Sequence, residues 1–116
     1  MSDLGWEIYP AGLGRLARVW ARRSGLPVYV TENGIADAVD AKRASFLIEH
    51  LTELGRVVAD GVDVRGYFHW SLTDNFEWAE GYAPRFGLFE VDYTTQERRA
   101  RPSAHVYAGI ARAREL

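Results

Sequence analysis

The stretch from Val28 to Gly34, VYVTENG, most constrains how this chain folds. The β-branched and aromatic run Val28–Val30 predicts a short buried strand, of the kind found in a parallel sheet that is covered on both faces. Asn33–Gly34 is a turn pair. Glu32 therefore stands where the strand ends, and the carboxyl ends of parallel strands are where α/β proteins build their sites. The alternatives for Glu32 are a solvated turn residue or a carboxylate near the start of the next helix.

Helical and extended patterns alternate along the chain. Apolar residues recur at helical spacing from Ala11 to about Ser24 and again from about Ala41 to Asp60. Extended runs occupy Val28–Thr31 and Val62–Trp70, and a last helix opens at Pro102. This order is expected of a parallel β/α architecture. No linker or internal repeat divides the chain, so residues 1–116 are expected to form one segment without an internal boundary.

The sequence supports four further local expectations. His50 has polar sequence neighbours and is assigned to the surface. Residues Arg85–Asp92 are predicted to be extended, with a turn after them. Ser103 follows Pro102 and is expected to cap the last helix. The arginines of the first helix, Arg15, Arg18, Arg22 and Arg23, are expected on its solvated outer face.

Composition excludes several classes of partner. The chain has 14 Lys and Arg against 16 Asp and Glu, which gives no basis for binding nucleic acid or an anionic membrane. There is no cysteine, and no apolar run reaches the ~18 residues of a membrane span. No signal peptide is visible at Met1, so a cytoplasmic location is expected. Asp74, Glu80 and Asp92 lack the spacing of a metal set, and no metal or other cofactor is expected.

The segment after the second predicted strand has the composition of a sugar-binding loop. Aromatic rings stack on the C–H faces of sugars, while carboxylates and amides pair with their hydroxyl groups. These groups are supplied by Trp70, Asn75, Glu77 and Trp78. In a parallel sheet these four residues would emerge at the same edge as Glu32. A retaining glycosidase needs a nucleophilic carboxylate about 5–5.5 Å from a second carboxyl group. Glu32 is the candidate nucleophile.

Each of these assignments has a structural alternative. Trp70 and Trp78 could be a packing pair under a long loop. Glu77 could form a salt bridge with Arg85. Spacing alone leaves both alternatives open.

Several long motifs occur in a fixed order: GWEIYP at Gly5–Pro10, LPVYVTENG at Leu26–Gly34, DGVDVRGYFHWSLTDNFEWAEGY at Asp60–Tyr82, RFGLFEVDY at Arg85–Tyr93, and the closing stretch Pro102–Tyr107. With these motifs the chain resembles the C-terminal part of the family 1 glycoside hydrolases, which include β-glucosidases and β-galactosidases. The resemblance implies an α/β fold made of the last two β/α units, strands seven and eight, of a TIM (β/α)8 barrel that is incomplete as a single chain. It also implies that Glu32 is the catalytic nucleophile of a retaining mechanism.

The resemblance further implies roles for the loop residues. Trp70 would be the platform beneath the sugar, and Glu77 would accept hydrogen bonds from two outer hydroxyl groups. Trp78 would donate its indole N–H to another hydroxyl, and Phe86 would help to wall the same pocket. These roles agree with the chemistry of the groups, because an ionised carboxylate only accepts and an indole only donates. A carboxylate at Glu77 would repel a sugar phosphate, so non-phosphorylated β-glycosides, with glucose among the expected ligands, are favoured.

The chain also departs from the family pattern. The family's acid/base carboxylate lies in a Thr-x-Asn-Glu-Pro motif that is absent from this sequence, and a barrel needs roughly 200 to 400 residues. We expect the chain to pair with a complementing barrel chain or to self-associate, and to be inactive alone. The alternatives to a nucleophile-bearing enzyme segment are a non-catalytic carbohydrate-binding fragment and an oligomerising barrel fragment with no ligand. The particular sugar and aglycone stay open.

Overall fold

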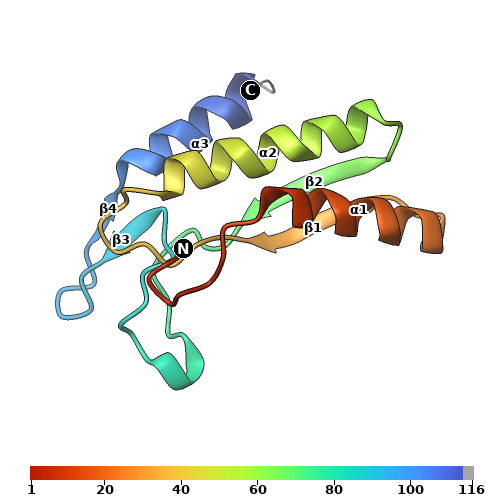
Figure 1. Ribbon diagram of the computed structural model, residues 1–116. Helices are drawn as coiled ribbons and strands as arrows, with labels where there is room; N and C mark the ends of the chain where they lie inside the picture. Colours follow the sequence, from red (N-terminus) through yellow and green to blue (C-terminus); the bar gives the residue numbers. More distant parts are fainter. Residues whose placement is uncertain (114–116) are drawn as a thin grey trace.

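The computed structural model describes residues 1–113, and Figure 1 shows their arrangement. Helices and strands alternate through the first two thirds of the chain, as the sequence predicts. The elements are α1 (Pro10–Ser24), β1 (Val28–Asn33), α2 (Arg43–Ala59), β2 (Val64–His69), the short 3-10 helix η1 (Trp78–Glu80), β3 (Phe89–Val91), β4 (Arg98–Ala100) and α3 (Pro102–Ala113). In this part of the chain no helix is long and apolar enough to cross a membrane.

Strands β1 and β2 pair in parallel and α2 connects them, which confirms the predicted β/α alternation. Val28 lies opposite Val64, and Asn33 lies opposite His69. The carboxyl ends of the two strands are therefore neighbours at one edge of the sheet.

The core lies between the strand pair and the helices. Ala17 of α1, Val30 of β1, and Leu54 and Val57 of α2 form one buried cluster. Helix α2 contacts both α1 and α3, and Figure 1 shows α2 between α3 and β2. A second cluster of Leu47, Leu88 and Ala104 joins α2 to α3 and to the segment before β3. Full burial of such side chains contributes about 1.5–3 kcal/mol each for the larger ones.

The other face of the strand pair is open, so the expectation of a strand covered on both faces is wrong for this chain. Val30 is buried, whereas Tyr29 is 55% exposed and Phe68 on β2 is 59% exposed. Side chains alternate between the two faces of a strand. Only the face that packs against α1 and α2 finds a partner within residues 1–113.

Two side chains lie deeper than predicted. His50 is only 3% exposed, because it lies on the apolar stripe of α2 and stacks on Phe46 with ring centroids 3.8 Å apart. Its Nδ1 lies 2.8 Å from the carbonyl oxygen of Phe46. Arg18 does not stay on the solvated face of α1, because it forms ion pairs with Glu53 at 2.9 Å and with Asp60 at 2.7 Å.

The C-terminal part folds as a hairpin and a helix. The predicted extended segment contains β3, which pairs antiparallel with β4, a strand that the sequence pattern did not reveal. Helix α3 is not capped by Ser103. Instead, Ser103 lies inside the helix, and its backbone N–H and hydroxyl group both donate to the carboxylate of Asp40, at 2.9 and 2.6 Å. Asp40, which is far from α3 in the sequence, thus accepts the hydrogen bonds at the start of this helix.

Candidate active site

The end of β1 places Glu32 at the edge of the sheet, where its side chain is exposed. The neighbouring Asn33 is held on two sides. Tyr67 of β2 donates its hydroxyl hydrogen to Asn33 Oδ1 at 3.0 Å, and the backbone N–H of Trp70 donates to the carbonyl oxygen of Asn33 at 3.0 Å. Burial raises the pKa of Tyr67, so this hydroxyl group remains a donor. The backbone around Glu32 is therefore fixed to the end of β2.

The loop after β2 is organised around Asp74, whose side chain is fully buried. Its carboxylate accepts hydrogen bonds from Arg101 Nη1 and Nη2 at 3.0 and 3.1 Å, and from the backbone N–H groups of Gly87 and Val91 at 2.9 and 3.2 Å. Arg85 Nη1 lies 3.2 Å from Asp74 Oδ2. Burial works against the charged form, but these donors outweigh it and the pKa of Asp74 lies below its ordinary value. Asp74 thus ties the loop to the β3–β4 hairpin and to the start of α3.

Aromatic contacts hold the tip of the same loop. Tyr82 packs between Phe76 and Tyr93, with ring centroids 5.1 and 4.5 Å away. Tyr93 also lies under the guanidinium group of Arg85 at 4.8 Å, and its hydroxyl group donates to the carbonyl oxygen of Asn75 at 3.3 Å. These contacts keep the segment before η1 close to the hairpin.

Glu77 is positioned by its neighbour in the loop and not by Arg85. Its Oε2 accepts a hydrogen bond from Asn75 Nδ2 at 2.8 Å, and its backbone N–H donates to Gly81 at 2.7 Å. Arg85 instead pairs with Asp74. The proposed Glu77–Arg85 salt bridge is therefore wrong. Trp78, which is 81% exposed, is not one half of a buried packing pair either.

A hollow of about 360 Å³ opens at the shared edge of the strands. It brings together five of the six residues that the sequence suggested, and Asn75 contacts it only through Glu77. The lining residues are Trp6, Glu32, Asn33, Gly34, Trp70, Glu77, Trp78 and Phe86. Glu32 and the tryptophan-rich loop therefore face one common space.

The walls of this hollow differ in burial. Phe86 is only 2% exposed and forms a fixed apolar wall, whereas Trp78 projects into solvent. Trp6 was not singled out from the sequence. Its ring lies 6.1 Å from that of Phe86, between centroids, and joins the same wall. The segment Gly5–Pro10 gave one signal that could have found it, namely an indole beside the charged Glu7 in a turn without helical or strand periodicity.

The arrangement suits a ligand rich in hydroxyl groups. Two carboxylates accept hydrogen bonds, indole N–H groups donate them, and flat rings present apolar faces. Within residues 1–113 no group of three or more His, Cys, Asp or Glu side chains could hold a metal ion.

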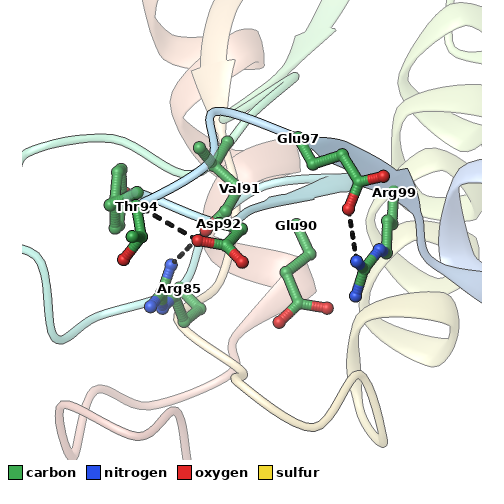
Figure 2. Close-up of a pocket in the computed structure, with 8 residues that line it drawn as sticks. Arg85, Glu90, Val91, Asp92, Thr94, Glu97 and Arg99 are labelled. Atoms are coloured by element: carbon green, nitrogen blue, oxygen red, sulfur yellow. Dashed lines mark hydrogen bonds and ion pairs between the residues drawn. The ribbon is translucent and has the colours of Figure 1, made fainter.

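A second hollow, of about 320 Å³, lies at the β3–β4 hairpin (Figure 2). Most of its charged groups are already bonded: Glu97 pairs with Arg99, and Asp92 accepts the backbone N–H of Thr94 at 2.8 Å. Arg85 donates to the carbonyl oxygen of Val91 at 3.1 Å. This hollow has one aromatic residue in its lining, Tyr93, whereas the first has Trp6, Trp70, Trp78 and Phe86, and the first is therefore the candidate site.

Comparison with known proteins supports the resemblance seen in the motifs. The profile of glycosyl hydrolase family 1 matches residues 1–116. The chain is 51% identical over 111 residues to a β-galactosidase of Sulfolobus acidocaldarius, covering 96% of this chain and 23% of that protein. It is 43% identical over 119 residues to a β-glucosidase of Agrobacterium sp., covering 95% of this chain and 26% of that protein.

Solved structures that resemble this chain are also glycosidases. The β-glycosidase from Pyrococcus horikoshii superposes with a TM-score of 0.96 at 51% identity, covering 99% of this chain and 27% of that one. The β-glucosidase from Thermotoga maritima gives 0.94 at 38% identity, covering 99% and 28%. These neighbours are TIM-barrel glycosidases, so the fold seen here is part of such a barrel. The chain spans about a quarter of the length of the relatives it matches, and it belongs to glycosyl hydrolase family 1.

Proposed function

We propose that this chain is the nucleophile-bearing segment of a retaining β-glycosidase, with β1 and β2 as strands seven and eight of the barrel. The observation that carries this proposal is the shared hollow, in which Glu32 at the end of β1 faces Glu77, Trp70 and Trp78 from the loop after β2. The proposed substrates are non-phosphorylated β-glycosides. The printed names of the relatives, β-galactosidase and β-glucosidase, support galactosides and glucosides as the classes to test.

In this mechanism a Glu32 carboxylate oxygen attacks the anomeric carbon as the bond to the aglycone oxygen breaks. A second carboxyl group, about 5–5.5 Å from the first, protonates the departing oxygen. Water then hydrolyses the glycosyl–Glu32 ester, and the second group takes the proton from that water. Glu77 is engaged with Asn75, and we assign it to sugar binding. The acid/base group would therefore come from the part of the barrel outside this chain.

The other residues of the hollow would recognise the sugar. Trp70 would lie under the ring as a platform, and Glu77 would accept two outer hydroxyl hydrogens. Trp78 would donate its indole N–H, and buried Phe86 would wall the pocket. Asn75 would act by holding Glu77 in place. Without the acid/base group the chain alone would be inactive, because general acid catalysis is commonly worth ~10²–10⁴ in rate.

Covalent labelling tests the central assignment. The chain would be assembled with the remaining three quarters of a family relative and incubated with a 2-fluoro-β-glucoside that carries a good leaving group. Mass spectrometry of the digested chain should find one glycosyl adduct, on Glu32. The Glu32→Gln variant should show none, and Glu80→Gln, which changes an exposed loop carboxylate outside the hollow, should label as the parent does. An assembled complex without an adduct on Glu32 would overturn the proposal.

A second candidate function is sugar binding without cleavage. It is favoured by one observation: Trp6, Trp70, Trp78 and Phe86 all lie on this chain, so four aromatic rings that can stack on a sugar are present without the rest of the barrel. Glucose titration of the chain alone, followed by tryptophan fluorescence, separates this candidate from a fragment with no ligand. A saturable change that is lost in Trp70→Ala and kept in Trp20→Ala would support it.

A further inference from the structure

The pair Asn33–Gly34 at the end of β1 can undergo a reaction of its own. An asparagine side chain that is followed by glycine cyclises readily, because glycine has no Cβ to hinder attack by its backbone nitrogen. Asn75 is the only other asparagine of the chain, and it is followed by the bulky Phe76. Asn33 and Gly34 line the hollow at the edge of the sheet and are only half-buried, so water can reach them. Asn33 is therefore the position at which this chemistry is expected.

The reaction is a deamidation in two steps. The Gly34 nitrogen attacks Cγ of Asn33 and forms a C–N bond, while the bond from Cγ to the side-chain nitrogen breaks. Ammonia leaves with the proton of the Gly34 N–H group, and a succinimide ring remains. Water then opens the ring at either carbonyl carbon. One opening gives aspartate, and the other gives isoaspartate, in which the backbone runs through the former side chain.

Strand β2 and the residue that follows it hold both reacting groups. Tyr67 donates its hydroxyl hydrogen to Asn33 Oδ1 at 3.0 Å, and this oxygen is attached to the carbon that would be attacked. The N–H of Trp70 donates to the carbonyl oxygen of Asn33 at 3.0 Å, and this carbonyl belongs to the same peptide unit as the nitrogen of Gly34. In an extended strand that nitrogen is turned away from the side chain. Because the peptide unit is planar, turning its nitrogen toward Cγ also moves the carbonyl oxygen away from Trp70.

We propose that Asn33 is a deamidation site that its hydrogen bonds to Tyr67 and Trp70 keep latent, and that conversion weakens the pairing of β1 with β2. Aspartate at this position would place a second carboxylate beside Glu32, and neighbouring like charges disfavour each other. Isoaspartate would lengthen the backbone next to Gly34, where even a Cβ would lie 1.5 Å from the carbonyl oxygen of Trp70. Both products therefore disturb the native end of β1. This chemistry is independent of the proposed function.

Peptide mapping of the full chain tests the site. The chain is kept in mildly alkaline buffer, either native or unfolded in guanidinium chloride, and is digested at intervals for mass spectrometry, which separates amide from acid by mass. Burial raises the pKa of Tyr67, so its hydroxyl group keeps its hydrogen in this buffer. Asn33 should convert when the chain is unfolded and about tenfold more slowly when it is native, the order of two hydrogen bonds. Asn75 should stay largely intact in both states.

Two matched variants test the hydrogen bond from Tyr67. Tyr67→Phe removes the hydroxyl group and keeps the ring, so conversion of Asn33 in the native chain should accelerate roughly two- to tenfold, the order of one hydrogen bond. In guanidinium chloride its rate should equal that of the parent. Tyr93→Phe removes a hydroxyl group that donates to the carbonyl oxygen of Asn75 at 3.3 Å, and it should leave the rate at Asn33 unchanged.

Several outcomes would overturn the inference. An intact Asn33 in the unfolded chain would show that the site does not react, and equal rates in the native and unfolded parent would show that the hydrogen bonds do not protect it. That comparison needs no variant and stands if Tyr67→Phe does not fold. A folded Tyr67→Phe chain that converts at the parent rate would remove Tyr67 from the inference. Chain converted while unfolded and then refolded should unfold at a lower denaturant concentration than the parent, and an unchanged midpoint would contradict the weakened strand pairing.

Discussion

Gly34 and Trp70 approach each other so closely that a side chain on Gly34 would occupy the position of the Trp70 backbone. A Cβ atom built at Gly34 would lie 1.5 Å from the carbonyl oxygen of Trp70. The adjacent hydrogen bond from the Trp70 N–H to the Asn33 carbonyl oxygen, at 3.0 Å, fixes this approach. The loop that carries Glu77 and Trp78 can therefore begin directly beside the end of β1.

Gly34→Ala should destabilise the chain because backbone, unlike a flexible side chain, cannot move aside without breaking the Asn33–Trp70 hydrogen bond. Overpacking typically costs about 1–3 kcal/mol, and we expect the upper part of that range in urea unfolding. Gly55→Ala is the control. Gly55 lies inside α2 with nothing near its missing Cβ, so alanine there should stabilise by roughly 0.5–1 kcal/mol. Equal stability of the two variants would contradict the close-approach argument.

Asp74→Asn should be among the most damaging single changes outside the apolar core. The amide keeps the shape but removes the charge that compensates Arg101, which is itself buried. Removing one partner of a buried pair costs about 3–5 kcal/mol. The free energy of unfolding in urea measures this loss.

The control is Asp63→Asn, which breaks the exposed ion pair with Arg65. Exposed pairs are worth about 0–1 kcal/mol, so the midpoint should hardly move. If Asp74→Asn were as mild as Asp63→Asn, the Asp74 network would not organise the loop.

Helix and strand positions could be predicted from the sequence because periodicity records which side chains meet the core. The wrong prediction for His50 arose because its neighbours in sequence, and not its helical spacing, were considered. His50 is four residues after Phe46 and four before Leu54, and so lies on the buried stripe despite its polar neighbours in sequence. Spacing along the helix, and not the adjacent residues, was the informative signal.

The buried polar interactions of Asp74 and Asp40 could not be predicted from periodicity. Asp74 meets Arg101 across 27 positions, and Asp40 meets Ser103 across 63, so no local spacing connects them. Strand β4 was missed for a similar reason, since Arg98–Ala100 is polar and exposed and becomes a strand only by pairing with β3. Glu32 and the loop tryptophans could be brought together from sequence because parallel strands place their carboxyl ends at one edge.

His69 should make stability depend on pH. Burial lowers the pKa of His69 to about 4, and the nearby charge of Arg43 acts in the same direction. Since the unfolded chain binds this proton near pH 6.5 and the folded chain does so only near pH 4, stability is full above pH 6.5 and falls as the pH drops between these values. The loss should approach roughly 3 kcal/mol by pH 4.

His69→Phe removes this titration and keeps an aromatic ring near Tyr107, whose ring centroid lies 6.2 Å from that of His69. The melting temperature of the variant should therefore decline less than that of the parent between pH 7 and 4. Burial also lowers the pKa of His50, so some decline should remain in both proteins. Parallel melting curves across this range would show that His69 does not titrate between the two values.

Asn75→Ala tests whether Glu77 must be held to bind sugar. Asn75 Nδ2 donates to Glu77 Oε2 at 2.8 Å, and without it the carboxylate is free to rotate away from the hollow. In the assembled complex the affinity for glucose should fall about tenfold, the order of one hydrogen bond to a charged group. The loss should appear in KM and leave kcat nearly unchanged, because in the proposed function Glu77 would bind outer hydroxyl groups, away from the bond that breaks, to the same extent in the ground and transition states. Gln96→Ala, which removes an exposed amide bonded to the carbonyl oxygen of Tyr93 at 2.9 Å, should alter neither constant. Unchanged glucose affinity in Asn75→Ala would mean that Glu77 is positioned by its backbone alone.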